Sequence, residues 1–498
     1  MISESQIPVI IIVAPLLGVL LVNVFGLFSK KSGICLLLTA VVLLIASAAS
    51  LKTLFQVMEN GVIGYRMGGW PPPFGIEYVI DHLNALVLVV VNAVSLIAVI
   101  FSGRSVKEEI PSYKIPLFYS ILILLVTGLS GITITGDAFN LYVLLEISAL
   151  TGYALIAVGR DHALMASFNY LLLGTIGASL YLLGTGHLYI MTGSLNMGDL
   201  SVILTDLYGS RAILIALLLI LVGTWIKMAF FPLHTWLPNS YTYAPTATSC
   251  IAAPLVTKVS VYIMLRAMFS IFTPNYVYDY LDLSGLIVWL AVVAIVMGSL
   301  LALAQKDLKR MLSYVLVAEV GYMVGGAWLA NSLGLTGTIL HIVNDALMTL
   351  CLFMAAGTIN YRTGDLSFSS MGGLYKKMPF TMTAFTIGAL SMIGVPPTAG
   401  FFSKWYLILG AVEAGRWEYM GALLFSSLVN VVLFFRIFEI AYFDGASEER
   451  GENRKSRIAE APLSMVAPLW IVAVSLIVIG IYTGDLVSNV IQYAVPIG

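Results

Sequence analysis

The chain is dominated by long apolar stretches. Windows of about 20 apolar residues, the length of an α-helix that crosses a bilayer, occur fourteen times in the 498 residues. They run at 7–28, 33–56, 82–102, 115–134, 138–158, 163–191, 211–231, 247–270, 283–303, 310–330, 334–357, 379–411, 417–443 and 463–484, and are numbered here in that order. Charged residues make up only 10% of the chain, against about 25% in soluble proteins. We therefore predict an all-α polytopic membrane protein with fourteen transmembrane helices.

The positions of lysine and arginine predict how the chain crosses the membrane. Sixteen of these 25 residues lie in odd-numbered loops, five lie in even-numbered loops or at their borders, and four lie inside spans. Because cytoplasmic loops are enriched in Lys and Arg, we expect the odd loops in the cytoplasm and both termini outside, in the cell (inner) membrane. The charged segment 444–460 is then cytoplasmic, either as a solvated connector or as a docking surface. Segment 61–78 is expected to form an external hairpin that caps the bundle.

Three lysines lie inside predicted spans. Each of Lys227, Lys258 and Lys404 has apolar sequence on both sides. A lysine at the bilayer centre costs about 2.5–3.5 kcal/mol on insertion scales, so such residues usually line an ion or proton path. For Lys258 the alternative is a lysine that extends to the membrane surface, although the apolar sequence around it makes this awkward. The three lysines are therefore the first candidates for a transport path.

Two of these lysines lie next to prolines. Pro232 follows Lys227, and Pro396 and Pro397 precede Lys404. Proline removes a backbone donor and clashes with the preceding turn, so spans seven and twelve should break at these points. Broken helices within a membrane occur where the freed backbone is buried or lines a wet cavity.

The two broken spans also predict an internal repeat. They are five crossings apart and so traverse the membrane in opposite directions, which is the pattern of an inverted repeat. We expect a three-helix segment at 1–114, a first inverted repeat at 115–270, a second at 283–443, and a C-terminal helix and tail at 463–498.

Buried acids and histidines accompany the lysines. Glu146 lies in the middle of span five, where it forms either a structural ion pair or the partner that tunes the span-seven lysine. Glu319 in span ten is its rough counterpart five spans later. His341 and Asp345 in span eleven are four residues apart and share one helix face, either as a proton relay or as a satisfied core cluster. His234 lies just past the first break, as a proton-uptake group or a plain loop residue.

No motif indicates a cofactor, a nucleotide or a metal. The three cysteines share no metal-ligand spacing, so we expect them to be small core residues. A net charge of −1 does not indicate binding to nucleic acid. The chain shows no energy source of its own, and whether it belongs to an enzyme is left open. Three functions remain: a proton-translocating subunit of a larger membrane complex, a self-contained proton-coupled secondary transporter, and a non-pumping membrane scaffold.

Four segments resemble one known family. They are GDAFNLYVLLE (136–146), KMAFFPLHTWLPNSYTYAPT (227–246), QKDLKRMLSYVLVAEVGYM (305–323) and GVPPTAGFFSK (394–404). This set is similar to the antiporter-like membrane subunits shared by respiratory complex I, Mrp-type multisubunit Na+/H+ antiporters and membrane-bound hydrogenases. The resemblance covers nearly the whole chain and is greatest to the second large membrane component of the Mrp antiporters, known as the D type.

The resemblance implies roles for particular residues. It assigns a proton path along the membrane midplane to Glu146, Lys227, Lys258 and Lys404. It also implies other membrane subunits as partners and protons as cargo, with Na+ left open. Family members often continue span eleven as HxxNHAxxK, whereas this chain carries Asp345 in place of the second histidine and has no lysine at the last position of the motif. Its central relay therefore has one cation fewer and one acid more.

Overall fold

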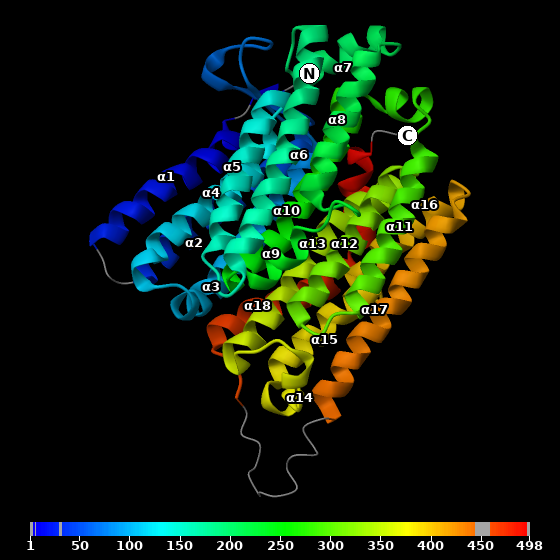
Figure 1. Ribbon diagram of the computed structural model, residues 1–498. Coiled ribbons are helices and arrows are strands. Elements are labelled where there is room, and N and C mark those ends of the chain that lie inside the picture. Colours follow the sequence, from blue (N-terminus) through cyan, green and yellow to red (C-terminus); the bar gives the residue numbers. More distant parts are fainter. Residues whose placement is uncertain (1–2, 5, 29–31, 444–458, 496–498) are drawn as a thin grey trace, which may run out of the picture.

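The protein is a bundle of long helices that lie roughly side by side (Figure 1). The computed structural model describes residues 3–4, 6–28, 32–443 and 459–495, so the predicted connector 444–460 lies almost entirely outside the described residues. Every predicted span coincides with a helix or, for span twelve, with a pair of helices. The all-α membrane fold is thereby confirmed.

The helices of the first part of the chain are α1 (Ile7–Phe28), α2 (Ser32–Asn60), α3 (His82–Glu109), α4 (Ile115–Ile134), α5 (Ala138–Ala157), α6 (Ala163–Thr192), α7 (Met197–Ile203), α8 (Arg211–Met228), α9 (Leu237–Tyr243) and α10 (Thr246–Arg266). Those of the second part are α11 (Ser284–Leu303), α12 (Leu308–Ala327), α13 (Ser332–Thr363), α14 (Leu374–Lys377), α15 (Pro379–Ile393), α16 (Ala399–Glu413), α17 (Trp417–Phe443), α18 (Leu463–Ile481) and α19 (Thr483–Asn489). Within the described residues, 12 helices are long and apolar enough to cross a membrane. The two predicted spans outside this set are α12 and the broken pair α15–α16, so the total of fourteen crossings stays a prediction.

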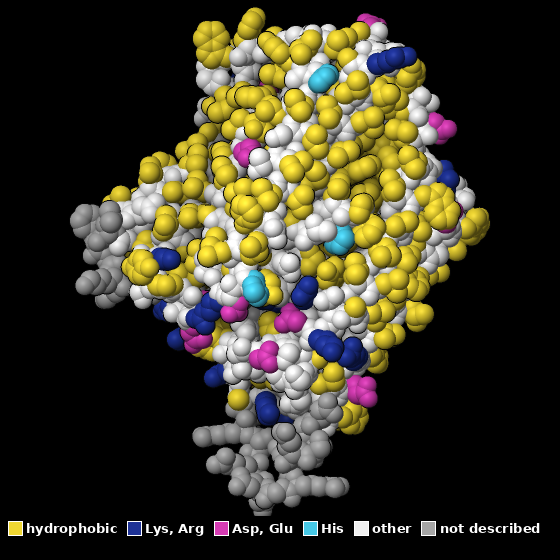
Figure 2. Space-filling model, viewed as in Figure 1, with side chains coloured by type: hydrophobic (Ala, Val, Ile, Leu, Met, Phe, Trp, Pro, Cys, Tyr) yellow, Lys and Arg dark blue, Asp and Glu magenta, His cyan; other side chains and the backbone are white. Residues whose placement is uncertain are grey.

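Burial separates central helices from peripheral ones. In the most apolar 18-residue window of the span formed by α10, and in that of α13, 94% of the residues are buried inside the protein. The corresponding values are 33% for α1 and 39% for α6. Apolar side chains cover the middle of the face shown in Figure 2, while charged side chains gather toward its lower end. An apolar belt of this kind suits contact with lipid or with other membrane subunits. It follows that α10 and α13 form the protected centre of the bundle.

A small sheet joins the start of the chain to the segment before α3. Strands β2 (Ile63–Arg66) and β3 (Glu77–Ile80) pair antiparallel, which confirms the predicted hairpin, and β1 (Ser3–Glu4) adds to β2 in parallel. The sheet itself was not predicted. The ring of His82, just after β3, lies 5.4 Å from the ring of Tyr493 near the end of the chain. The first strand and the last turn therefore lie at the same end of the bundle, as an even number of crossings requires.

Both predicted helix breaks are present. Helix α8 ends at Met228, and Ala229 follows with a left-handed φ of 60° before the chain resumes as α9. Helix α15 ends at Ile393, and Gly394 follows with φ 93° before α16 begins at Ala399. Each proline predicted to cause a break lies in the gap between the two helices. The backbone is thus opened beside Lys227 and on the approach to Lys404.

The two halves share a detailed local geometry. Asp137 and Asp307 cap α5 and α12, each accepting a backbone hydrogen bond from the residue three positions on, at 2.7 Å and 2.8 Å. Each aspartate also forms an isolated antiparallel bridge, to Asn196 and to Ser367 respectively. These matched features support the predicted repeats at 115–270 and 283–443, whose boundaries stay a prediction.

Candidate functional site

The centre of the bundle holds a buried ion pair. Lys258 on α10 lies 2.8 Å from Asp345 on α13, and both side chains are almost fully buried. The hydroxyl of Thr349, one turn along α13, donates to Asp345 at 2.8 Å. The ammonium of Lys258 therefore does not extend to the membrane surface. Instead it faces the second half of the chain.

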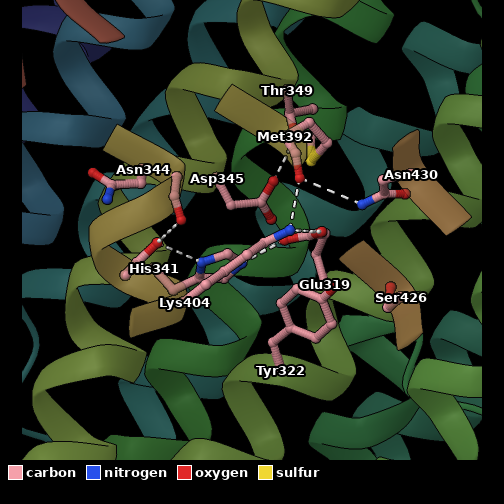
Figure 3. Close-up of polar contacts among 12 residues, drawn as sticks. Glu319, Tyr322, His341, Asn344, Asp345, Thr349, Met392, Lys404, Ser426 and Asn430 are labelled. Carbon is pink, nitrogen blue, oxygen red and sulfur yellow. Dashed lines mark hydrogen bonds and ion pairs between the residues drawn. The ribbon is translucent and has the colours of Figure 1, made fainter. Parts of the chain in front are cut away.

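A second cluster lies beside this pair and is drawn in Figure 3. The Nε2 atom of His341 lies 2.6 Å from Oε2 of Glu319. The other carboxylate oxygen of Glu319 lies 3.8 Å from Nζ of Lys404. Lys404 also donates a hydrogen bond of 2.6 Å to the carbonyl of Met392, at the end of α15. Glu319 thus connects the histidine of α13 to the lysine that follows the second helix break.

Further side chains fix this cluster. Nδ1 of His341 lies 2.9 Å from the hydroxyl of Ser403, so both ring nitrogens have polar partners. Nζ of Lys404 lies 5.1 Å above the centre of the Tyr322 ring, a geometry that favours a cation. Asn344 donates to the carbonyl of Ala399 at 2.7 Å, which ties α13 to the start of α16.

The environment of Lys404 includes an acid that is distant in the sequence. Apolar sequence surrounds Lys404 on both sides, but Glu319 on α12 is buried next to it. Nothing near Lys404 in the sequence reveals this neighbour, since only the packing of α12 on α13 and α16 brings the two groups together. The resulting Glu319–Lys404 pair is the counterpart, in the second half, of the Glu146–Lys227 pair.

That first pair lies at the other broken helix. Nζ of Lys227 lies 3.6 Å from Oε1 of Glu146, as predicted, and the lysine side chain is 3% exposed while the glutamate is 24% exposed. The Nζ atom of Lys227 has no hydrogen-bond partner within the described residues. The indole N–H of Trp236 donates to the carbonyl of Ile226 at 2.9 Å and so satisfies part of the opened backbone. A cavity of about 10 Å³ beside Lys227, also lined by Ser260 of α10, has room for about one water molecule.

His234 lies apart from both clusters. It is largely buried, and its ring lies 5.1 Å from that of Phe231 and 6.1 Å from that of Tyr314 on α12. Its Nδ1 atom is buried and has no hydrogen-bond partner within the described residues. His234 is therefore an interior residue and not a surface loop residue.

The predicted site residues thus form two groups. The first is the Glu146–Lys227 pair. The second contains the Lys258–Asp345 pair and the cluster of His341, Glu319 and Lys404, with donor atoms of Asp345, His341 and Glu319 within 4.8 Å of one another. Among the described residues, no hydrogen bond or ion pair joins Lys227 directly to Lys258. Passage between the two groups therefore needs water or side-chain movement.

One subset of the second group has the spacing of a metal site. The donor atoms of Glu319, His341 and Asp345 all lie within 4.8 Å of one another. However, both carboxylates already face lysines, Lys404 and Lys258, whose charges oppose a cation at the same place. The arrangement is chemically suited to protons shared among acids, an imidazole and amines.

Several contributors were not predicted from the sequence. Thr349, Tyr322 and Ser403 each lie near a predicted residue, at four, three and one positions from Asp345, Glu319 and Lys404 respectively. The first two spacings place the side chains on a shared helix face and could have marked them. The carbonyl of Met392 has no sequence signal, because any residue supplies a carbonyl.

The chain is similar to known membrane proteins along nearly its whole length. Residues 135–430 match the family described as NADH:quinone oxidoreductase/Mrp antiporter, transmembrane. NADH-quinone oxidoreductase subunit N of Desulforudis audaxviator is 42% identical, with 99% of each chain covered. The D-type component of a Na(+)/H(+) antiporter of Alkalihalophilus pseudofirmus is 30% identical, with 98% of this chain and 96% of that protein covered.

Solved structures of related membrane complexes contain chains with the same fold. A chain of the membrane-bound sulfane sulfur reductase, an archaeal respiratory membrane complex, superimposes with a TM-score of 0.90 at 31% identity, covering 98% of this chain and 97% of that one. A chain of the Mrp complex from Dietzia gives a TM-score of 0.87 at 22% identity, with 99% and 97% covered, and shows the same fold. The family match spans more than half of the chain, and the relatives are covered almost from end to end. The chain therefore belongs to the NADH:quinone oxidoreductase/Mrp antiporter family of membrane subunits.

Proposed function

We propose that this chain is a proton-translocating, antiporter-like subunit of a multisubunit membrane complex. The observation that carries the proposal is the buried series of charged groups, with Lys227 paired to Glu146, Lys258 to Asp345, and Lys404 to Glu319. Each pair joins two different helices, and each lysine lies in the apolar interior. A membrane protein keeps buried lysines against a considerable insertion cost, which supports a function in transport.

The pairs provide a way to move protons. An acid close to a buried lysine favours the protonated ammonium, and weakening that contact favours release of the proton. A shift of Glu146 away from Lys227 would drive a proton toward the second group, and the Lys258–Asp345 pair would receive the change in charge. His341, between Ser403 and Glu319, can then pass a proton toward Lys404. The energy for the shift comes from neighbouring subunits in this proposal.

The names of the relatives suggest the cargo, and the distribution of lysine and arginine suggests the orientation. The proposed cargo is H+, and the antiporter names of some relatives make Na+ the second ion to test. The odd-numbered loops are placed in the cytoplasm and both termini outside the cell (inner) membrane, on the basis of the lysine and arginine distribution. The proposed partners are other membrane subunits, which the apolar outer faces of α1 and α6 suit.

A second candidate function is a non-pumping scaffold. Its support is that the same ion pairs also link helices: Lys258–Asp345 joins α10 of the first half to α13 of the second, and Glu319–Lys404 joins α12 to α16 within the second half. Under this alternative, neutral substitutions impair assembly and leave transport per assembled complex unchanged. A self-contained secondary transporter, the third candidate, would move ions when purified alone.

Two substitutions separate these functions. In the reconstituted complex, Glu146→Gln and Lys227→Ala should each abolish proton transport, because each removes one member of the first pair. Transport is measured with a pH-sensitive dye in proteoliposomes, and assembly is measured on native gels. Glu439→Gln, at an exposed position on α17, is the matched control. Normal pumping by the assembled Glu146→Gln complex would refute the proposal.

A further inference from the structure

A polar cavity lies at the odd-loop end of the bundle, outside the site described above. Its volume is about 410 Å³, and its walls come from α3, the α5–α6 connection, the α9–α10 junction, the start of α12 and the end of α13. The N-terminal segment and both halves of the chain therefore meet around it. All of these segments border odd-numbered loops.

The charges in the wall are unbalanced. Four acids line the cavity against two basic residues, and these are Glu109, Asp161, Asp307, Asp365, Arg160 and Lys309. Burial raises the pKa of the Asp307 carboxyl. The hydroxyl and N–H of Ser367 hold the pKa of Asp365 below its usual range. An acidic, concave wall concentrates protons and other cations from the adjoining solution.

Lys309 is the unusual group in this wall. The residue is 4% exposed, and Nζ donates one hydrogen bond, of 3.2 Å, to the carbonyl of Ala244. Within the described residues no carboxylate oxygen lies within 4.0 Å of it, in contrast to the three lysines of the proposed path. Ala244 lies between α9 and α10, directly after the first broken span. Lys309 thus links the start of α12, in the second half of the chain, to the α9–α10 junction of the first half.

A second observation indicates water in the cavity. The hydroxyl oxygen of Thr246, another wall residue, is buried and has no hydrogen-bond partner within the described residues. Its backbone N–H donates to Glu109 at 2.6 Å, which leaves only the hydroxyl unsatisfied. Buried polar groups are nearly always hydrogen-bonded to protein or to ordered water, and a cavity of this size holds many water molecules.

Helix α12 leads inward from this cavity. Lys309 and Glu319 are ten residues apart, which is about 15 Å along a helix axis. Tyr314 lies midway between them, and its ring contacts that of His234, whose Nδ1 atom has no partner within the described residues. One helix therefore carries the cavity lysine, the contact to the buried histidine and the acid of the proposed path.

We propose that this cavity is the water-filled inlet through which protons reach the buried path from the odd-loop face, and that Lys309 is the group at its inner end that takes them up. The inference rests on the proposed function, and it adds Lys309, Glu109 and the cavity to it. The cargo at this site is hydronium carried on a chain of water molecules. His234 is the next acceptor on the way to Glu319.

Access to the cavity is tested first. Asn360 lines the cavity on α13, and the native cysteines Cys35, Cys250 and Cys351 are all buried. Asn360→Cys in the assembled complex should react with a membrane-impermeant thiol reagent from the odd-loop face, and the attached group should slow proton transport at least fivefold. A label at the exposed odd-loop position of Lys376→Cys should change the rate less than twofold. Because the reagent is added to complex that has already folded and assembled, this test does not depend on whether a substitution impairs folding.

The role of the lysine is tested in the same vesicles. Lys309→Met should lower proton transport at least tenfold, while Lys306→Met, at an exposed position three residues away, should stay within twofold of the parent. The proposed inlet would be refuted by any of three results: Asn360→Cys does not react, the attached label does not change transport, or Lys309→Met transports normally. Lys227→Ala is run alongside. If it abolishes transport while Lys309→Met does not, the inlet is wrong and the proposed function stands; if neither affects transport, the proposed function itself fails.

Discussion

The substitution Asp345→Asn tests the central ion pair with a minimal change of shape. Asparagine can keep the hydrogen bond from Thr349 but removes the charge 2.8 Å from Lys258. The remaining partners of Lys258 are distant, at 3.4 Å to the carbonyl of Ala253 and 3.5 Å to the hydroxyl of Thr349. The lysine must then stay charged without a counterion or lose its proton.

Both outcomes have similar costs. Breaking a buried pair by removing one partner costs about 3–5 kcal/mol. Neutralising an ordinary lysine of pKa near 10.4 at pH 7 costs about 4.6 kcal/mol, which lies within the same range. We therefore expect Asp345→Asn to destabilise the complex by about 3–5 kcal/mol and to stop transport. Native gels and thermal melting measure the first effect, and dye-based proton uptake in vesicles measures the second.

The double variant separates structure from transport. Adding Lys258→Met to Asp345→Asn removes the uncompensated charge, so most of the lost stability should return. Transport should stay absent, because methionine cannot carry a proton. Asp279→Asn, at an exposed position, controls for loss of an acid. If the single variant is as stable as the parent, the pair contributes no stability; if the double variant recovers transport, the path does not pass through Lys258.

Other parts of the structure give three further predictions. Because Glu319 lies 3.8 Å from Lys404, Lys404→Glu would place two carboxylates together, and it should transport no better than Lys404→Ala in the same dye assay. At Asp81, burial opposes ionisation, but the Arg266 guanidinium and nearby N–H groups hold the pKa of the carboxyl below its usual range. This stabilisation is fully present above about pH 4 and is lost as the pH falls through the lowered pKa of Asp81. Asp81→Asn should therefore remove the part of the fall in melting temperature at acid pH that this carboxyl causes. A cysteine placed in 444–460 should be labelled only in inverted vesicles, and labelling from outside intact cells would show that the topology is reversed.

The sequence predicts those features that depend on local chemistry. The apolar windows predict the helices, because a lipid-facing backbone must satisfy its own hydrogen bonds. The breaks at Pro232 and at Pro396 and Pro397 follow from the missing backbone donor. The pairing of Lys227 with Glu146 was predicted from one acid in the middle of span five, and the ion pair is confirmed, while its role in tuning the lysine stays a prediction.

Other features depend on packing between distant segments. Glu319 was recognised as a buried acid, but its simultaneous contact with His341 and Lys404 requires α12, α13 and α16 to meet at one point. The direct pairing of Asp345 with Lys258 depends in the same way on the packing of α10 against α13. Periodicity within a single helix shows which face a side chain occupies, but it does not show which helix that face meets.

The two halves match in backbone geometry but differ in how they expose their acids. Glu146 is 24% exposed, whereas Glu319 is fully buried between a histidine and a lysine. A change in a neighbouring subunit can therefore reach the first pair directly, by offering Glu146 another partner or by covering it. The second pair can respond only through groups inside this chain, of which Asp345 and His341 are the nearest. Since an ion pair weakens when either member gains a competitor, we propose that the complex acts on this chain at the first pair and that the second pair completes the step.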